Sequence, residues 1–185
     1  MKQVKKLVFI ALFLAIGTVL DAVVPGFFFG MKPDLLLSTM FLTIFLFADR
    51  RNIAVIGLAA GLLSGLTSTI PGGFLPNVID KLITSAVIFA LFLAIRKLLP
   101  LMVNAVILTA AGTILSGTVF LTALQLCASL PPGTGFLAMF TAVVLPAAVI
   151  NAVFIAIVFP IVYKIINHTP SSTKAFRTDV SSRRG

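Results

Sequence analysis

Charged and reactive side chains are scarce in this sequence of 185 residues. Only 10% of the residues are charged, and the chain contains one cysteine and one histidine. A single cysteine cannot form an internal disulfide, and we expect Cys127 to be buried as a core residue. We expect His168 to be solvated in a polar C-terminal tail. Because serine or metal hydrolysis inside a membrane would require an embedded histidine, we expect no enzymatic function, no metal site and no cofactor.

Two further observations restrict the function. The chain has no G-x-x-x-x-G-K-[ST] phosphate loop, so an ATP-driven process would need a partner that hydrolyses ATP. The net charge is +9, but the basic residues lie between and beyond apolar blocks rather than on one face of a soluble domain. We therefore expect no nucleic-acid partner, and the basic residues report the orientation of the chain in a membrane.

Long apolar blocks dominate the sequence. Hydrophobic residues make up 59% of the chain, and the mean hydropathy is +1.18. A helix needs roughly 17 to 25 apolar residues to cross a bilayer core, and backbone groups in hydrocarbon must be satisfied within the helix. The sequence therefore predicts an all-α membrane protein, a bundle of six transmembrane helices over residues 1–166 followed by a disordered cytoplasmic tail over residues 167–185. The expected spans are 7–24, 33–48, 53–70, 78–95, 101–125 and 136–163, of which 33–48 is the shortest.

The distribution of basic residues predicts that both ends of the chain are cytoplasmic. With six spans and an internal amino terminus, twelve of the fourteen lysines and arginines face the cytoplasm. The two exceptions, Lys32 and Lys81, fall at the outer face. All three outward loops carry a Pro-Gly turn, at Pro25, Pro71 and Pro132. The outward loops therefore have defined turns, and the two lysines at the outer face indicate capture of a small solute from outside.

Acidic residues accompany these lysines near the outer helix ends. Asp34 lies at the start of the second predicted helix, where capping alone could account for it. In the fourth, Asn77 is expected as the N-cap and Asp80 as its capping-box partner. Lys81 opposes the helix dipole in the first turn, so it needs a partner. That partner is Asp80, Asp34, water reached by snorkelling, or a bound anion.

Polar and aromatic side chains complete the predicted site. Asn77 and Lys81 share a helical stripe that should point into the bundle. Phe28 and Phe74 occupy outer loops, where they either anchor the chain at the membrane interface or form a lid over the solute. Such a lid over paired charges would suit an amphipathic solute with an apolar ring and a zwitterionic end. The predicted substrate-binding residues are Lys32, Asp34, Asn77, Asp80, Lys81, Phe28, Phe74 and Gln125.

Small residues mark two packing faces. Gly57, Gly61 and Gly65 repeat at a spacing of four, which favours close packing against another helix inside the bundle. Ala11 and Ala15 form a small-xxx-small pair in the first predicted helix. We expect this pair to contact a partner, either a neighbouring helix or another subunit.

Isolated polar residues in the last two apolar blocks have simpler interpretations. Asn104 and Asn151 are expected to form hydrogen bonds between helices. Thr118, Thr122 and Thr141 can offer polar contacts to a solute, although threonines in membrane helices often bond their own backbone.

Two motifs resemble a known family. Residues 30–34 (G-M-K-P-D) and 76–81 (P-N-V-I-D-K), together with the span pattern, resemble the TrpP family of bacterial tryptophan transporters. That family is similar to the substrate-binding S components of energy-coupling factor (ECF) transporters, which have six helices, an outer substrate pocket and an A-x-x-x-A motif on helix one. Here the motif runs from Ala11 to Ala15. The resemblance implies a multi-pass protein of the bacterial cell membrane, whose first helix docks on a transmembrane coupling protein that carries two ATPase subunits.

Three functional hypotheses follow. The leading one is the substrate-binding subunit of an ATP-driven ECF-type importer for tryptophan or a related aromatic solute. In it Lys32 or Lys81 meets the carboxylate of the solute, and Asp34 or Asp80 meets its amine. The first alternative is a solitary proton-coupled carrier in which Asp21, Asp34 or Asp80 titrates. The second is a non-transporting membrane scaffold that recruits partners through its small-residue faces.

Overall fold

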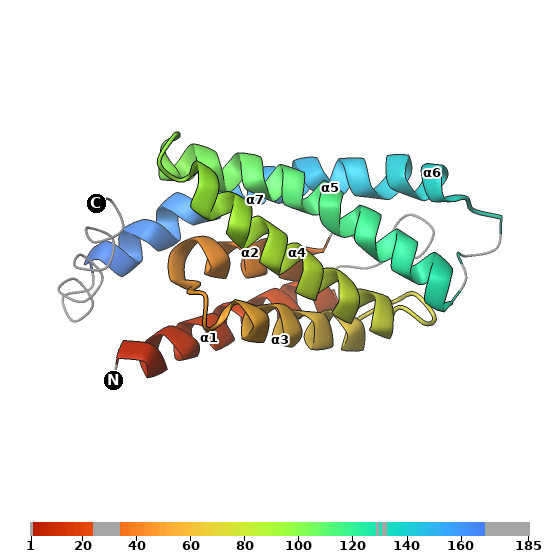
Figure 1. Cartoon of the computed structure of the whole chain (residues 1–185), viewed down its shortest axis with the longest axis horizontal. Helices are drawn as coiled ribbons and strands as arrows, with labels where there is room; N and C mark the ends of the chain where they lie inside the picture. The colour runs from red at the N-terminus through yellow and green to blue at the C-terminus, as the bar shows by residue number, and fades with distance from the viewer. Residues whose placement is uncertain (1, 24–33, 129, 131–132, 169–185) are drawn as a thin grey trace.

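The computed structural model describes residues 2–23, 34–128, 130 and 133–168. Every regular element in these residues is helical, which confirms the all-helical prediction (Figure 1). The elements are α1 (Lys2–Val23), α2 (Leu35–Phe47), α3 (Ile53–Leu66), α4 (Phe74–Ile95), α5 (Leu101–Cys127), α6 (Phe136–Met139), the π-helical η1 (Phe140–Val144) and α7 (Leu145–His168).

The helices form a bundle in which successive segments run in alternate directions. The last three elements make one continuous apolar segment, Phe136–Ile166. Figure 1 shows that α1 begins and α7 ends at the same end of the bundle. By length and composition four segments can cross a membrane, whereas α2 and α3 have 13 and 14 residues and are shorter.

The short helix α2 lies in the centre of the bundle. All of its residues except Leu35 are buried, and it contacts α1, α3, α4, α5 and α7. A helix enclosed in this way shows almost no amphipathic pattern, because every face meets protein. Because protein rather than lipid surrounds α2, the length of this helix need not match the thickness of the hydrocarbon core.

The glycines of α3 hold it against α4. A Cβ at Gly61 would lie 2.8 Å from the Cα of Val78, and a Cβ at Gly57 would lie 3.0 Å from the carbonyl oxygen of Lys81. Only a hydrogen at these positions allows the two backbones to approach this closely. The interpretation of the glycine repeat as internal packing is confirmed. This contact fixes the rotation of α4 and so directs its polar stripe into the bundle.

The start of α4 differs from the prediction. The helix begins at Phe74 with Gly73 as its N-cap, so the expectation that Asn77 is the N-cap was wrong. Pro76 falls within the first turn, where helical N–H groups have no partner in the helix and proline is tolerated. Asn77 lies one residue further on, and its Nδ2 donates to the Gly73 carbonyl at 2.8 Å. Asp80 therefore lies too deep in the helix to act in a capping box.

Isolated polar residues mostly satisfy one another or the backbone. Asn151 joins α7 to α5 through Thr113, and Asn104 donates to the carbonyls of Ile95 and Leu99, which ties α5 to the end of α4. These contacts confirm the expected interhelical hydrogen bonds. The hydroxyls of the three threonines Thr118, Thr122 and Thr141 donate to carbonyls within their own helices.

The end of α5 projects beyond the packed part of the bundle. Cys127 is the last residue of α5 and is exposed, so the expectation of a buried core cysteine was wrong. Its neighbour Leu126 is 80% exposed and residues 125–128 are all exposed, whereas Leu124 in the same turn is buried. At the other end of the chain α7 continues to His168, two residues beyond the predicted domain end, and residues 169–185 lie outside the described residues.

Candidate functional site

A cavity of about 100 Å³ lies at the end of the bundle where α2 and α4 begin and α3 and α5 finish. This end is opposite to the start of α1 and the end of α7 (Figure 1). One part of the wall is charged or polar, and the other part is apolar. The charged and polar lining residues include Asp21, Asp34, Ser64, Thr67, Asn77, Asp80, Lys81, Thr113 and Ser116.

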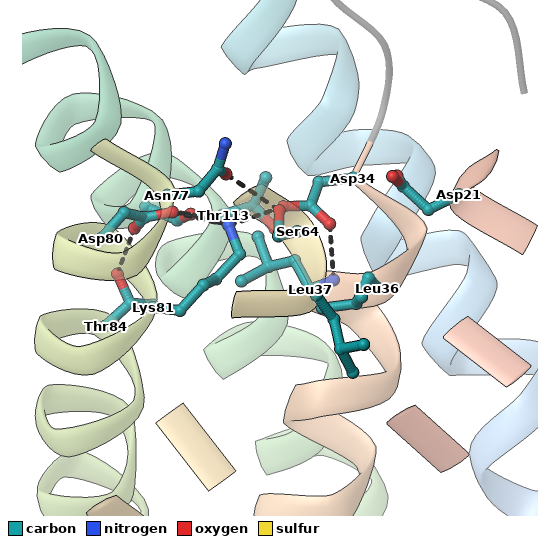
Figure 2. A network of polar contacts seen from close by, with 12 residues as sticks. Asp21, Asp34, Leu36, Leu37, Ser64, Asn77, Asp80, Lys81, Thr84 and Thr113 are labelled. Carbon is teal, nitrogen blue, oxygen red and sulfur yellow. Dashed lines mark hydrogen bonds and ion pairs between the residues drawn. The ribbon is translucent and has the colours of Figure 1, made fainter. Parts of the chain in front are cut away.

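Lys81 is the centre of the charged part. Its Nζ lies 2.6 Å from Asp34 Oδ2 and 2.6 Å from Asp80 Oδ2, and the lysine side chain is only 1% exposed (Figure 2). Asp34 comes from the start of α2, whereas Asp80 and Lys81 are neighbours on α4. Two carboxylates thus face one ammonium group, and the cluster carries a formal charge of −1. A buried charge is tolerated only when it is paired in this way.

The two carboxylates differ in how firmly they are held. Asp80 is fully buried, and its oxygens accept hydrogen bonds from Thr84 Oγ1 at 2.8 Å and Ser116 Oγ at 2.7 Å as well as from Lys81. Asp34 has a side chain that is 25% exposed, and its other oxygen caps α2 by accepting from the Leu37 N–H at 2.7 Å. Asp80 is therefore held by three side-chain donors inside the bundle, whereas Asp34 is held by two donors and is partly exposed.

Hydrogen bonds from serine and threonine hydroxyls connect the helices around the charged cluster. Ser64 Oγ of α3 donates to Asn77 Oδ1 at 2.9 Å, which joins α3 to α4. Thr67 Oγ1 donates to Asp21 Oδ2 at 3.0 Å, and Asp21 is only 3% exposed near the end of α1. These bonds bring a third carboxylate to the same cavity. The polar part of the wall is therefore predominantly anionic.

The apolar part of the wall comes from four parts of the chain. It consists of Leu37, Ile70, Phe120, Val143 and Val144, with Gly117 and Ala147 beside them. The two valines are consecutive in the π-helical η1, and both line the cavity. The cavity thus offers an aromatic ring and branched aliphatic side chains opposite an ion cluster. This arrangement suits a solute with one charged end and one apolar end.

Four of the predicted site residues meet in this cavity: Asp34, Asn77, Asp80 and Lys81. Lys81 has the aspartate partners that the sequence indicated. The expected inward stripe of α4 is present, because Thr84 and Ser85 are also buried.

Two other predicted binding residues, Phe74 and Gln125, do not line the cavity. Phe74 is 43% exposed and packs beside Gly65, and Gln125 is exposed on the last turns of α5. Lys32 and Phe28 lie outside the described residues. Ala11 and Ala15 are both exposed on α1, on a surface that no described helix covers.

Most of the other lining residues were not predicted from the sequence, and three of them, Thr113, Ser116 and Phe120, lie together on α5. Thr109, Thr113 and Ser116 recur at helical spacing along α5, and all three are buried. This polar stripe in an otherwise apolar block was the signal that could have revealed them. Phe120 continues from the stripe by one turn, which places an aromatic side chain above the hydroxyls.

Residues 3–167 match the family model described as "Tryptophan transporter TrpP". The chain belongs to this family. Members of the TrpP family with similar sequences include a "Probable tryptophan transport protein" of Bacillus subtilis (strain 168), 47% identical over 90% of this chain and 95% of the relative. A protein of the same name from Clostridium acetobutylicum is 40% identical over 88% of this chain and 94% of the relative. No solved structure matches this chain.

Membership of the TrpP family also fixes the location of the protein. The chain belongs to a transporter family and has several apolar helices long enough to cross a bilayer. It is therefore a multi-pass protein of the bacterial cell membrane. The resemblance seen in the sequence is confirmed.

Proposed function

We propose that this protein binds tryptophan in the described cavity and transports it across the cell membrane. The names of the relatives support tryptophan as the solute. The observation that carries the proposal is the position of Lys81, a buried cation held between two carboxylates beside an apolar cavity. Tryptophan needs such a combination, because it carries a carboxylate, an ammonium group and a large apolar ring.

The proposed topology has six crossings with both chain ends in the cytoplasm. In the described residues, all basic side chains except Lys81 belong to the end of the bundle opposite the cavity or to the connections there. They are Lys2, Lys5, Lys6, Arg50, Arg51, Arg96, Lys97 and Lys164. The positive-inside rule supports a cytoplasmic location for this end and hence an external location for the cavity.

Recognition of the zwitterion would proceed by exchange of ion partners. The tryptophan carboxylate would take the place of Asp34 beside Lys81, and the released Asp34 would meet the tryptophan ammonium group. Asp80 would stay in place, because three donors hold its two oxygens and it is fully buried. Each charged group would keep an oppositely charged partner, which avoids the large cost of an unpaired buried charge. Of the two aspartates that the sequence offered as partners of the amine, Asp34 is therefore the one that we propose.

Equilibrium binding to purified protein tests this assignment. We expect saturable tryptophan binding by the wild type and a loss of at least about tenfold in affinity for Asp34→Asn, since one charge-assisted contact is removed. Tryptamine lacks the carboxylate and indole-3-propionate lacks the amine, so each should bind at least about tenfold more weakly than tryptophan. The matched control is Asp49→Asn, which removes an aspartate paired with Lys6 far from the cavity.

The outcomes separate the two parts of the proposal. Absence of any saturable tryptophan binding to folded wild-type protein would refute tryptophan as the solute. Equal affinity of the Asp34→Asn variant and the wild type would refute the exchange of partners, while leaving tryptophan binding intact.

For the energy source we propose an ECF-type arrangement in which α1 docks on a coupling protein with ATPase subunits. Ala11 and Ala15 support it, because both are exposed on α1 and a small-xxx-small face allows close approach of another helix. Uptake should then require the ATPase module. We expect Ala15→Leu to abolish coupled uptake and to leave tryptophan binding unchanged. Ala90→Leu is the matched control, since Ala86 and Ala90 form an exposed pair of the same spacing on α4.

Vesicles that contain this protein alone decide between the coupled subunit and the alternatives. Accumulation of tryptophan under a proton gradient without an ATPase would refute the ECF arrangement in favour of a proton-coupled carrier. A complete lack of small-molecule binding would favour the scaffold instead.

A further inference from the structure

Asn151 carries a buried hydrogen-bond acceptor that has no donor. The residue lies in α7 and is fully buried. Its Nδ2 donates to Thr113 Oγ1 at 3.2 Å, but its Oδ1 has no hydrogen-bond partner among the residues that the structure describes. Buried polar atoms without partners are rare in folded proteins, and each requires an explanation such as a bound ligand or water.

The neighbouring hydrogen bonds fix the orientation of the amide. Thr113 Oγ1 donates its only hydrogen to the Thr109 carbonyl at 2.8 Å. Its oxygen can therefore only accept from Asn151, so the amide nitrogen must face Thr113 and the amide oxygen must point away from it. The unsatisfied atom is thus an acceptor, and its missing partner is a hydrogen-bond donor.

The amide does not itself line the cavity, but it adjoins the part of the wall that Thr113 and Ala147 form. Thr113, its hydrogen-bond partner, lines the cavity from α5. Ala147 also lines the cavity and lies one turn before Asn151 on the same face of α7. Along their helices, Val143, Val144 and Phe120 lie nearer than Asn151 and Thr113 to the end of the bundle that holds the cavity. A flat ring that enters along the wall would direct its inner edge toward Asn151.

We propose that Asn151 Oδ1 accepts a hydrogen bond from the indole N–H of bound tryptophan and thereby makes the cavity selective for indole over rings without a donor. This inference rests on the proposed function. The zwitterionic end of the solute occupies the Lys81 and Asp34 end of the cavity, and the indole ring extends inward along the apolar wall. An indole N–H requires an acceptor when it is buried. A site built to bond an N–H group rejects analogues that lack it, because the acceptor of the protein is then left unpaired.

Binding of tryptophan and of 3-(benzothiophen-3-yl)alanine to the purified full chain tests the proposal. The analogue has sulfur in place of the indole N–H, so it keeps the size and the zwitterionic end but loses the donor. We expect the wild type to bind the analogue at least about tenfold more weakly than tryptophan. In Asn151→Leu, which keeps the branched shape of the side chain without its polar atoms, the two ligands should bind with nearly equal affinity. Asn151→Ala removes the side-chain volume instead of replacing it, and it should show the same loss of discrimination.

The matched control is Asn104→Leu. Asn104 is also fully buried, and its Oδ1 also has no partner among the described residues, but it contacts Ile95 and Leu99 at the opposite end of the bundle. This variant should keep the discrimination of the wild type. Because the readout is a ratio of two affinities, a general loss of stability does not imitate the effect.

Three results distinguish the possible failures. If the wild type binds tryptophan and the analogue equally, the Asn151 acceptor has another partner such as a buried water, and the proposal is overturned. If the Asn151 variants retain full discrimination, the donor is recognised elsewhere and the proposal is equally overturned. If the folded wild type binds neither ligand, the proposed function fails, and with it the premise of this inference.

Discussion

Replacement of Lys81 by methionine should expose the cost of an unpaired charge at the core of the site. Met approximates the length of the lysine stem but cannot neutralise Asp80, which is fully buried. Breaking a buried ion pair by removal of one partner costs about 3 to 5 kcal/mol. Thr84 and Ser116 still donate to Asp80, so the lower end of this range applies. Asp34 contributes little to the loss, because its side chain is 25% exposed and can regain water.

The expected destabilisation is therefore about 3 kcal/mol, measured by reversible chemical unfolding of the purified protein in micelles. The double variant Lys81→Met/Asp80→Asn removes the unpaired charge and should recover most of this loss. Neither variant should bind tryptophan, because both lack the ammonium group. Lys6→Met is the matched control, and since Lys6 is 23% exposed in its pair with Asp49, its cost should stay below about 1 kcal/mol.

Two outcomes would refute this reasoning. A Lys81→Met variant as stable as the wild type would mean that Asp80 is not an isolated buried charge. A double variant less stable than the single variant would show that the charge of Asp80 is not the source of the cost.

Two further predictions concern packing and ring recognition. Gly61→Ala should destabilise the protein by about 1 to 3 kcal/mol, because a Cβ there meets the α4 backbone. Gly135→Ala should cost less than about 1 kcal/mol in the same unfolding assay, since no described residue lies within 4 Å of its Cβ position. Phe120→Ala should weaken tryptophan binding at least about tenfold, because the aromatic part of the apolar wall is lost; an unchanged affinity by calorimetry would remove this residue from the ring-binding wall.

The charged part of the site could be predicted from the sequence because its signal survives without tertiary structure. Lys81 opposes the positive-inside bias, and an ammonium group within an apolar helix requires an acidic partner wherever the chain folds. Its predicted position in the first turn was wrong, because α4 begins at Phe74 and Lys81 lies two turns further on. Asp34 and Asp80 were the acidic residues near the same predicted helix ends. Which of the two is exchangeable could not be predicted, because this depends on the burial of Asp80 among Thr84 and Ser116.

The apolar wall was harder to predict because it depends on how each helix is rotated. A phenylalanine has the same sequence signature whether it faces lipid or a cavity, since both environments are apolar. Phe74 was therefore predicted as a binding residue and Phe120 was not, yet Phe74 is 43% exposed whereas Phe120 is 8% exposed and lines the cavity. The π-helical turn that presents Val143 and Val144 has no sequence signal of its own.

The predictions of helix boundaries and of burial were wrong where a local sequence signal competed with packing. Asn77 has the side chain of an N-cap, but the close contact of α3 with α4 continues to Phe74 beside Gly65, and the helix starts there. Cys127 looked buried because its neighbours are apolar, but in a membrane protein apolar residues also cover the outer surface. Hydrophobicity therefore located the helices of this chain, and it did not distinguish their inner from their outer faces.

Accessibility of the cavity to a reagent outside the cell tests the central claim most directly. Ser68 lines the cavity, and Ser68→Cys in a Cys127→Ser background gives the chain a single thiol there. In intact cells a membrane-impermeant maleimide should label this thiol, and excess tryptophan should slow the labelling. Labelling that occurs only after the membrane is permeabilised, or at a rate that tryptophan does not change, would contradict an external tryptophan-binding cavity.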